Sequence, residues 1–147
     1  MTATDQTLET CNALLIREIA AVETYSQVID KFDTEAADTA LERIRADHQA
    51  NVFELHKLIA DGHAEPATGA GSWSGFGQAL QEADVLTGES PVLKNLQAGE
   101  ELGISQYENA LANADVSEAA KAVIKRTLLP VLSGHLIDLQ QRRDQVQ

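Results

Sequence analysis

The stretch Glu18–Tyr25, which reads EIAAVETY, has a counterpart later in the chain, Glu100–Tyr107, which reads EELGISQY. In both stretches a Tyr follows a Glu by seven residues, and a His comes about one helix later, at His48 and His135. Glu and His repeated on separate helices are the residues with which a four-helix bundle builds a metal site in its core. The repeat therefore predicts one architectural unit, a helical hairpin, used twice.

Length and composition favour a single all-α domain over residues 1–147. The chain is 44% apolar but only 4% aromatic, and its apolar residues are mostly Ala, Leu, Val and Ile, which favours helices over sheets. The net charge of −12 argues against nucleic acid as a partner and against an anionic membrane surface. No run of residues reaches transmembrane length.

The single cysteine excludes an intrachain disulfide. Cys11 falls on an apolar helical stripe, where it is expected to behave as a small buried hydrophobic residue. The polar stretch Met1–Thr10 lacks the apolar segment of a signal peptide. We therefore expect a cytoplasmic protein.

Apolar residues recur at steps of three and four over four long segments, which predicts four helices. Ser117 is expected to cap the last of them, and Pro130 to kink it. The predicted helices are Thr7–Phe32, Thr34–Ala60, Pro91–Ala114 and Ser117–Gln147.

A long crossover separates the two predicted hairpins. Gly, Pro and Ser concentrate between Glu65 and Gly75, and a short helix is expected at Gln78–Leu86. Short connections elsewhere make the hairpins antiparallel, so the prediction is a bundle with one crossover. Trp73 and Phe76 could anchor a partner, such as a second copy in a homodimer. The favoured alternative is that they close the end of the bundle.

Helical geometry places the polar residues of the repeat on the inner faces. His48 and His135 lie at the centres of their apolar stripes, and Glu18 and Glu100 lie within theirs. Residues beside the two His are Asn51, Arg45 and Asp138, and Tyr25 and Tyr107 lie within or beside the stripes of the two Glu. Gly99 and Gly103 leave room for a Tyr, a His or a bound species.

A buried carboxylate needs a partner, so Glu18 and Glu100 must be neutralised or hydrogen-bonded. Three possibilities remain open from the sequence. A metal ion could be shared with His48 and His135, the hydroxyls of the two Tyr could donate hydrogen bonds, or Arg45 could form salt bridges.

The segment Asn12–Tyr25 resembles the first helix of bacterioferritins and rubrerythrins, and Ser133–Asp138 is similar to the His segment of their last helix. The chain is also similar to a family of small, uncharacterised bacterial ferritin-like bundles. The residues that carry this second likeness are Gly71–Gly75, Ala79-Leu80, Leu86–Gly88 and Leu96–Glu101. These resemblances imply a ferritin-like four-helix bundle. In the bacterioferritin and rubrerythrin pattern, Glu18 would be an iron ligand and Tyr25 would support it.

The chain departs from the di-iron pattern at two positions. Such bundles carry Glu-x-x-His on two helices, but the residues three before His48 and His135 are Arg45 and Leu132. Two bridging carboxylates are therefore missing, and one divalent ion is predicted in place of two. Its expected ligands are Glu18, His48, Glu100 and His135, with Asp138 as a fifth ligand or a supporting residue. Tyr25, Tyr107, Arg45 and Asn51 surround them.

Mixed nitrogen and oxygen ligands suit iron or zinc. Three functions follow from these observations. The first is a metal-binding bundle, the second is a metal-free bundle with a structural, stress-related or protein-interaction role, and the third is a rubrerythrin-type redox enzyme. The sequence does not identify a small-molecule substrate.

Overall fold

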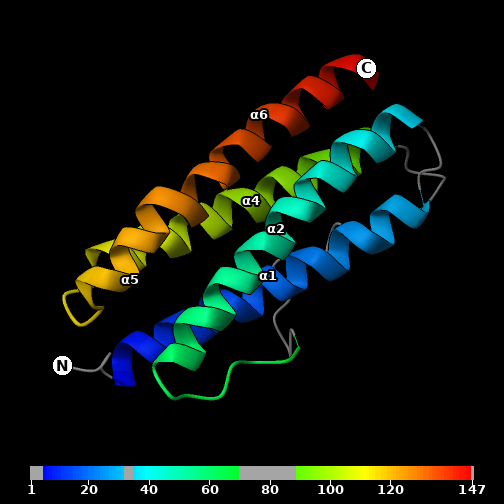
Figure 1. The fold of residues 1–147 in the computed structure, drawn as a ribbon. Coiled ribbons are helices and arrows are strands. Elements are labelled where there is room, and N and C mark those ends of the chain that lie inside the picture. Colours follow the sequence, from blue (N-terminus) through cyan, green and yellow to red (C-terminus); the bar gives the residue numbers. More distant parts are fainter. Residues whose placement is uncertain (1–4, 32–34, 70–88, 147) are drawn as a thin grey trace.

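The computed structural model describes residues 5–31, 35–69 and 89–146. These residues form helices and connecting segments, and none of them lies in a strand, which confirms the all-α prediction. The elements are α1 (Asp5–Lys31), α2 (Glu35–Asp61), α4 (Glu89–Ala112), α5 (Glu118–Val123), the π-helical η1 (Ile124–Leu128) and α6 (Leu129–Val146). The last three follow one another without a break and act as the fourth helix of a bundle (Figure 1).

The four helices form two hairpins, as the repeat predicted. α1 packs mainly against α2, and α4 packs mainly against α6. Figure 1 shows that α2 and α4 run in the same direction, so the end of α2 and the start of α4 lie at opposite ends of the bundle. The short helix predicted at Gln78–Leu86 and the residues Trp73 and Phe76 lie outside the described residues.

The helix ends agree with the sequence predictions to within two residues at the described boundaries. Ser117 caps α5, because its Oγ accepts a hydrogen bond from the Ala120 N–H at 3.2 Å. α2 ends at Asp61, before Gly62. The left-handed residue there is His63, with φ of 62°, so the glycine is not the position that needs a positive φ.

The proline predicted to kink the last helix follows a π-helical turn. Pro130 has no N–H to donate to the carbonyl of Arg126, and the preceding η1 segment widens the helix so that the Leu129 N–H bonds to the Ile124 carbonyl. π-helical turns of this kind are frequent at functional sites. One carbonyl of this turn, that of Leu128, accepts a hydrogen bond from Asn51 Nδ2 at 3.2 Å.

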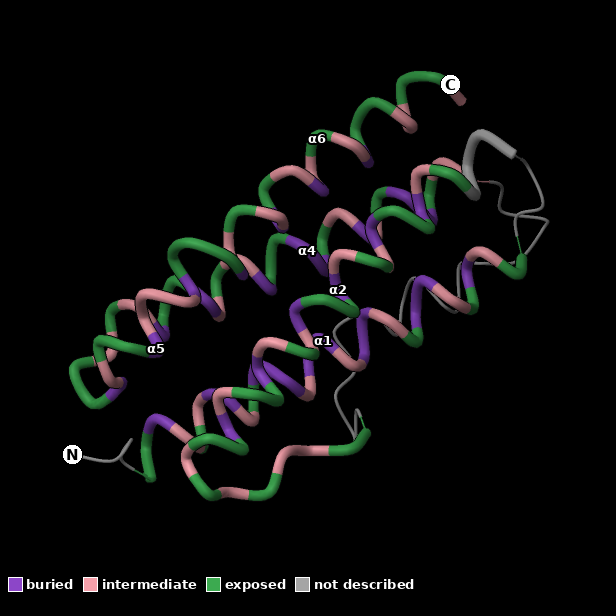
Figure 2. The backbone as a smooth tube through the Cα atoms, viewed as in Figure 1, coloured by how far each residue is buried: buried purple, intermediate pink, exposed green. Residues whose placement is uncertain are grey.

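Two apolar clusters fill the bundle, and the polar residues of the repeat lie between them. One cluster includes Cys11 and Leu15 near the start of α1, and the other includes Val28 near its end. Figure 2 shows the buried positions following the inner faces of all four helices. Cys11 is 1% exposed, as predicted. Among the described residues, no helix is long and apolar enough to cross a membrane.

Candidate metal centre

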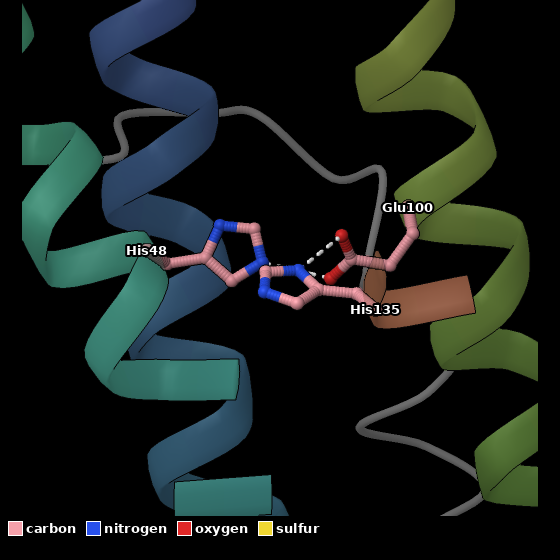
Figure 3. A group of neighbouring side chains, drawn as sticks. All are labelled: His48, Glu100 and His135. Atoms are coloured by element: carbon pink, nitrogen blue, oxygen red, sulfur yellow. Dashed lines mark hydrogen bonds and ion pairs between the residues drawn. The ribbon is translucent and has the colours of Figure 1, made fainter. Parts of the chain in front are cut away.

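Three of the four predicted principal ligands converge from three different helices. His48 extends from α2, Glu100 from α4 and His135 from α6, and Figure 3 shows their side chains pointing toward one another. His48 and Glu100 are fully buried, and His135 is 1% exposed. Each lies on the apolar stripe of its helix, so burying those stripes brings the three polar groups into one layer.

The donor atoms of these three residues are close enough to share an ion. His48 Nε2 lies 2.7 Å from Glu100 Oε2, and His135 Nδ1 lies 3.0 Å from Glu100 Oε1. One ligand atom from each residue falls within 4.8 Å of the others. Ligand atoms in a tetrahedral zinc site lie about 3.4 Å apart. Small side-chain rotations would therefore form a three-ligand site.

Each histidine has a carboxylate on the ring nitrogen that faces away from Glu100. Glu18 Oε1 lies 2.5 Å from His48 Nδ1, and Asp47 Oδ2 lies 2.9 Å from His135 Nε2. A carboxylate in this position fixes the tautomer and the orientation of a metal-binding imidazole. Glu18, predicted as a ligand, thus lies on the side of the His48 ring that faces away from Glu100 in this structure.

The hydroxyls of the two tyrosines donate hydrogen bonds from one hairpin to the other. Tyr25 from the first hairpin donates to Glu100 of the second at 2.6 Å, and Tyr107 of the second donates to Glu18 of the first. Asn51 Nδ2 also donates to Glu18, at 3.0 Å. The predicted hydrogen-bond network therefore exists, and it locks both carboxylates in place.

A buried arginine that the sequence analysis missed completes the layer. Arg17 is fully buried, and its Nη2 lies 2.5 Å from Glu18 Oε2. Its guanidinium carbon lies 4.9 Å from the centre of the Tyr107 ring, within the range of a cation–π contact. The small face predicted on α4 makes room for this group, because a Cβ at Gly103 would come within 2.5 Å of Arg17 Nη1.

These contacts keep both glutamates ionised. Burial alone would raise the pKa of Glu18, but the charges of Arg17 and His48 outweigh it and hold the pKa at about 2. The pKa of Glu100 is likewise held well below its usual range, because His48 and His135 outweigh the effect of burial. Burial would lower the pKa of His48, yet Glu100 and Glu18 raise it to about 10. His48 is therefore protonated at neutral pH when no metal is bound.

Both tyrosines remain protonated donors in this layer. Burial and the neighbouring glutamates raise the pKa of Tyr25 and of Tyr107 well above the usual value. An uncharged phenol can donate a hydrogen bond to a carboxylate, whereas a phenolate cannot. The raised pKa values therefore preserve the bonds that bridge the two halves of the repeat.

Two residues predicted near the site lie elsewhere. Arg45 was one of three possible partners for the buried glutamates, but it is half-buried and its Nη1 donates to Ser26 Oγ at 3.2 Å. Its position beside the stripe directs it to the seam between α1 and α2. Asp138 is not brought to the three ligands: its carboxylate lies 3.5 Å from Arg43 Nη2.

The sequence held a signal for Arg17 but none for Asp47. The positions three and four residues to either side of Arg17 are all apolar, which indicates a buried face of α1. Those positions are Ala13, Leu14, Ala20 and Ala21. Asp47 keeps 42% of its side chain exposed, and nothing in the repeat matches it, because Gly134 precedes the second His.

The residues present fit one ion better than two. Arg45 and Leu132 replace the carboxylates that a two-ion bundle site requires. Glu18 also has its oxygens occupied by His48, Arg17, Asn51 and Tyr107. Among the described residues, only His48, Glu100 and His135 form a group of three or more close candidate ligands.

The fold and the buried polar layer define an all-α four-helix protein with a candidate metal-binding group in its core. The family described as Domain of unknown function (DUF2383) matches residues 6–113, and the chain belongs to this family. The matched region includes Glu18, His48 and Glu100, whereas His135 follows it. Comparison with curated proteins and with solved structures gave no match.

Proposed function

We propose that this bundle binds one divalent metal ion through His48 Nε2, Glu100 and His135 Nδ1. The observation that supports this most is the pair of carboxylates behind the two imidazoles. Glu18 and Asp47 occupy the outer ring nitrogens, so the remaining nitrogens both face Glu100. Metal-binding histidines are supported in the same way, and the loss of such support costs about 10–100-fold in affinity.

Zinc or ferrous iron suits this ligand set best. Two imidazoles and one carboxylate occur in zinc sites and in iron sites that keep open positions. Cys11 lies in one of the apolar clusters, so a thiolate does not contribute. A bound ion would supply a Lewis-acidic centre, and the burial of all three ligands would shield it from bulk water.

Elemental mass spectrometry tests the proposal directly. Protein purified without chelator and reconstituted with zinc or ferrous iron should hold about one ion per chain, and His48→Ala and His135→Ala should hold none. His56→Ala is the matched control, because His56 is an exposed histidine on the same helix as His48. Equal metal content in all four proteins, or no metal in wild type, would contradict the proposal.

A metal-free bundle is the second candidate, and one observation favours it. Arg17 and protonated His48 supply two positive charges beside the two negative charges of Glu18 and Glu100. The layer is then neutral without an ion, and its role would be to fix how the helices pack. A structural or protein-interaction function would follow, including self-association as a homodimer.

The metal-free candidate can be tested by two measurements. Zinc, ferrous iron and chelators should leave the melting temperature unchanged, because no ion would bind the folded state preferentially. Light scattering across a range of protein concentrations would distinguish a dimer from a monomer. A metal-dependent rise in melting temperature would exclude this candidate.

A further inference from the structure

Arg17 is buried without the hydrogen bonds that usually accompany a buried guanidinium. Its Nη2 donates to Glu18, but Nε and Nη1 have no hydrogen-bond partner among the described residues. Burying polar donors without acceptors is costly. The benefit of this position must therefore come from the positive charge, which lies beside Glu18 and over the Tyr107 ring.

Comparing Glu18 with Glu100, its counterpart in the repeat, shows which group the Arg17 guanidinium stands in for. In the register that pairs Glu18 with Glu100, the counterpart of Arg17 is Gly99. Glu100 has an imidazole on each side, from His48 and His135, and both can turn a nitrogen toward an ion. Glu18 has one imidazole, from His48, and the guanidinium in place of the other.

The α4 helix is shaped to accept this guanidinium. A Cβ on Gly103 would lie 2.5 Å from Nη1 and 2.9 Å from Cζ of Arg17. Real Cβ atoms do not approach other atoms so closely, so any other residue at this position would displace the group. The counterpart of Gly103 in the first hairpin is Ala21, so glycine occupies this position of the repeat only in the second hairpin.

We propose that Arg17 is a built-in cation that occupies the place of a second metal ion at Glu18. A divalent ion could bind this carboxylate only by displacing the guanidinium, and otherwise two cations would meet in a buried layer of low dielectric. Arg17 therefore limits the bundle to one ion. This inference rests on the proposed function for the first ion, but the Glu18 position can be tested without that ion.

Removing the guanidinium should create a cation site built from oxygen atoms. Glu18 would offer its carboxylate, Tyr107 a hydroxyl oxygen, and Asn51 its amide oxygen after rotation of the amide. Oxygen ligands of this type suit Mn²⁺. Arg17→Met removes the charge and keeps an apolar side chain of similar length, whereas Arg17→Lys keeps a positive charge at the same place.

The decisive comparison uses chains that already carry His135→Ala, which removes a ligand of the first site. Native mass spectrometry with Mn²⁺ alone should show no bound ion in His135→Ala, one in the double variant with Arg17→Met, and none in the double variant with Arg17→Lys. An equal number of ions in the three proteins would overturn the inference. So would an added ion in the lysine variant.

Failure of this inference can be told apart from failure of the proposed function. With His135 intact, one ion in wild type and one in Arg17→Met would leave the first site standing and refute the role of Arg17. If wild type binds no ion, but Arg17→Met binds one both with His135 intact and with His135→Ala, the first site would be refuted and the role of Arg17 would stand. If Arg17→Met is unfolded without metal, Mn²⁺ should refold it, as circular dichroism would show. A chain that stays unfolded at saturating Mn²⁺ would count against the inference.

Discussion

Gly103 provides the sharpest test of how the buried layer is held together. It lies within α4, where replacing glycine by alanine ordinarily stabilises a helix by about 1 kcal/mol. The new methyl group would lie 2.5 Å from Arg17 Nη1 and 2.9 Å from Leu132 Cδ2. Neither group can move freely, because Arg17 is bonded to Glu18 and Leu132 is fully buried.

The expected loss of stability follows from these contacts. Overpacking a core position costs about 1–3 kcal/mol. Separating a buried charge from its partner costs about 3–5 kcal/mol more. After the gain in helix propensity is subtracted, Gly103→Ala should lower the free energy of unfolding by at least about 3 kcal/mol. The melting temperature should fall by at least about 6 °C.

Gly134→Ala is the matched control for this substitution. Gly134 lies within α6, and a Cβ at this position would meet no atom within 4 Å. This variant should therefore be more stable than wild type, by up to about 1 kcal/mol. Urea unfolding followed by circular dichroism measures both variants under one condition. If Gly103→Ala is as stable as Gly134→Ala, the guanidinium does not occupy the place described for it, and the reasoning fails.

Four further predictions follow from the same layer and its surroundings. The folded chain lowers the pKa of Glu18 from 4.5 to about 2, so the resulting stability is complete above about pH 4.5 and is lost as the pH falls toward 2. Urea unfolding in chelator should show this acid dependence, and Glu18→Gln should make it shallower. Asp47→Asn should weaken zinc binding by about 10–100-fold in a competition titration, whereas unchanged affinity would remove Asp47 from the support of the metal site. Asn51→Ala should destabilise the fold by about 1–3 kcal/mol in thermal unfolding, since the buried Glu18 carboxylate and the Leu128 carbonyl each lose a hydrogen bond from the Asn51 amide. Burial raises the pKa of the Cys11 thiol to about 11, so a thiol reagent should react with unfolded but not with native protein.

The sequence was sufficient for the fold because the apolar periodicity and the repeat agree. The stripes around His48 and His135 predict which faces are buried, and burying them also predicts that these residues converge with Glu100. Helix boundaries followed from local chemistry, as at Ser117. The π-helical turn before Pro130 was not predicted, because a proline indicates where a helix is disturbed but not how the preceding backbone hydrogen bonds rearrange.

The contacts between side chains within the buried layer were harder to predict from the sequence. The apolar residues around Arg17 indicate that it is buried, but its contact with Glu18 beside Gly103 depends on the packing of α1 against α4. Arg45 lies beside the apolar stripe of α2 and bonds to Ser26 instead. Asp47 reaches His135 because α6 lies beside α2 at this level, although its own helical position is half exposed. Such contacts depend on how helices face one another, which periodicity within one helix does not encode.

The two candidate functions differ in whether Nε2 of His48 carries a proton or a metal ion. Without metal, His48 carries a proton between Glu18 and Glu100, and Arg17 supplies the second positive charge. A metal ion bound to Nε2 must displace a proton from that ring, because a protonated nitrogen has no lone pair to give. The contacts that make the metal-free layer stable therefore compete directly with the ion. Binding should strengthen as the pH rises, and the protein's metal content will depend on both pH and metal concentration rather than on the fold alone.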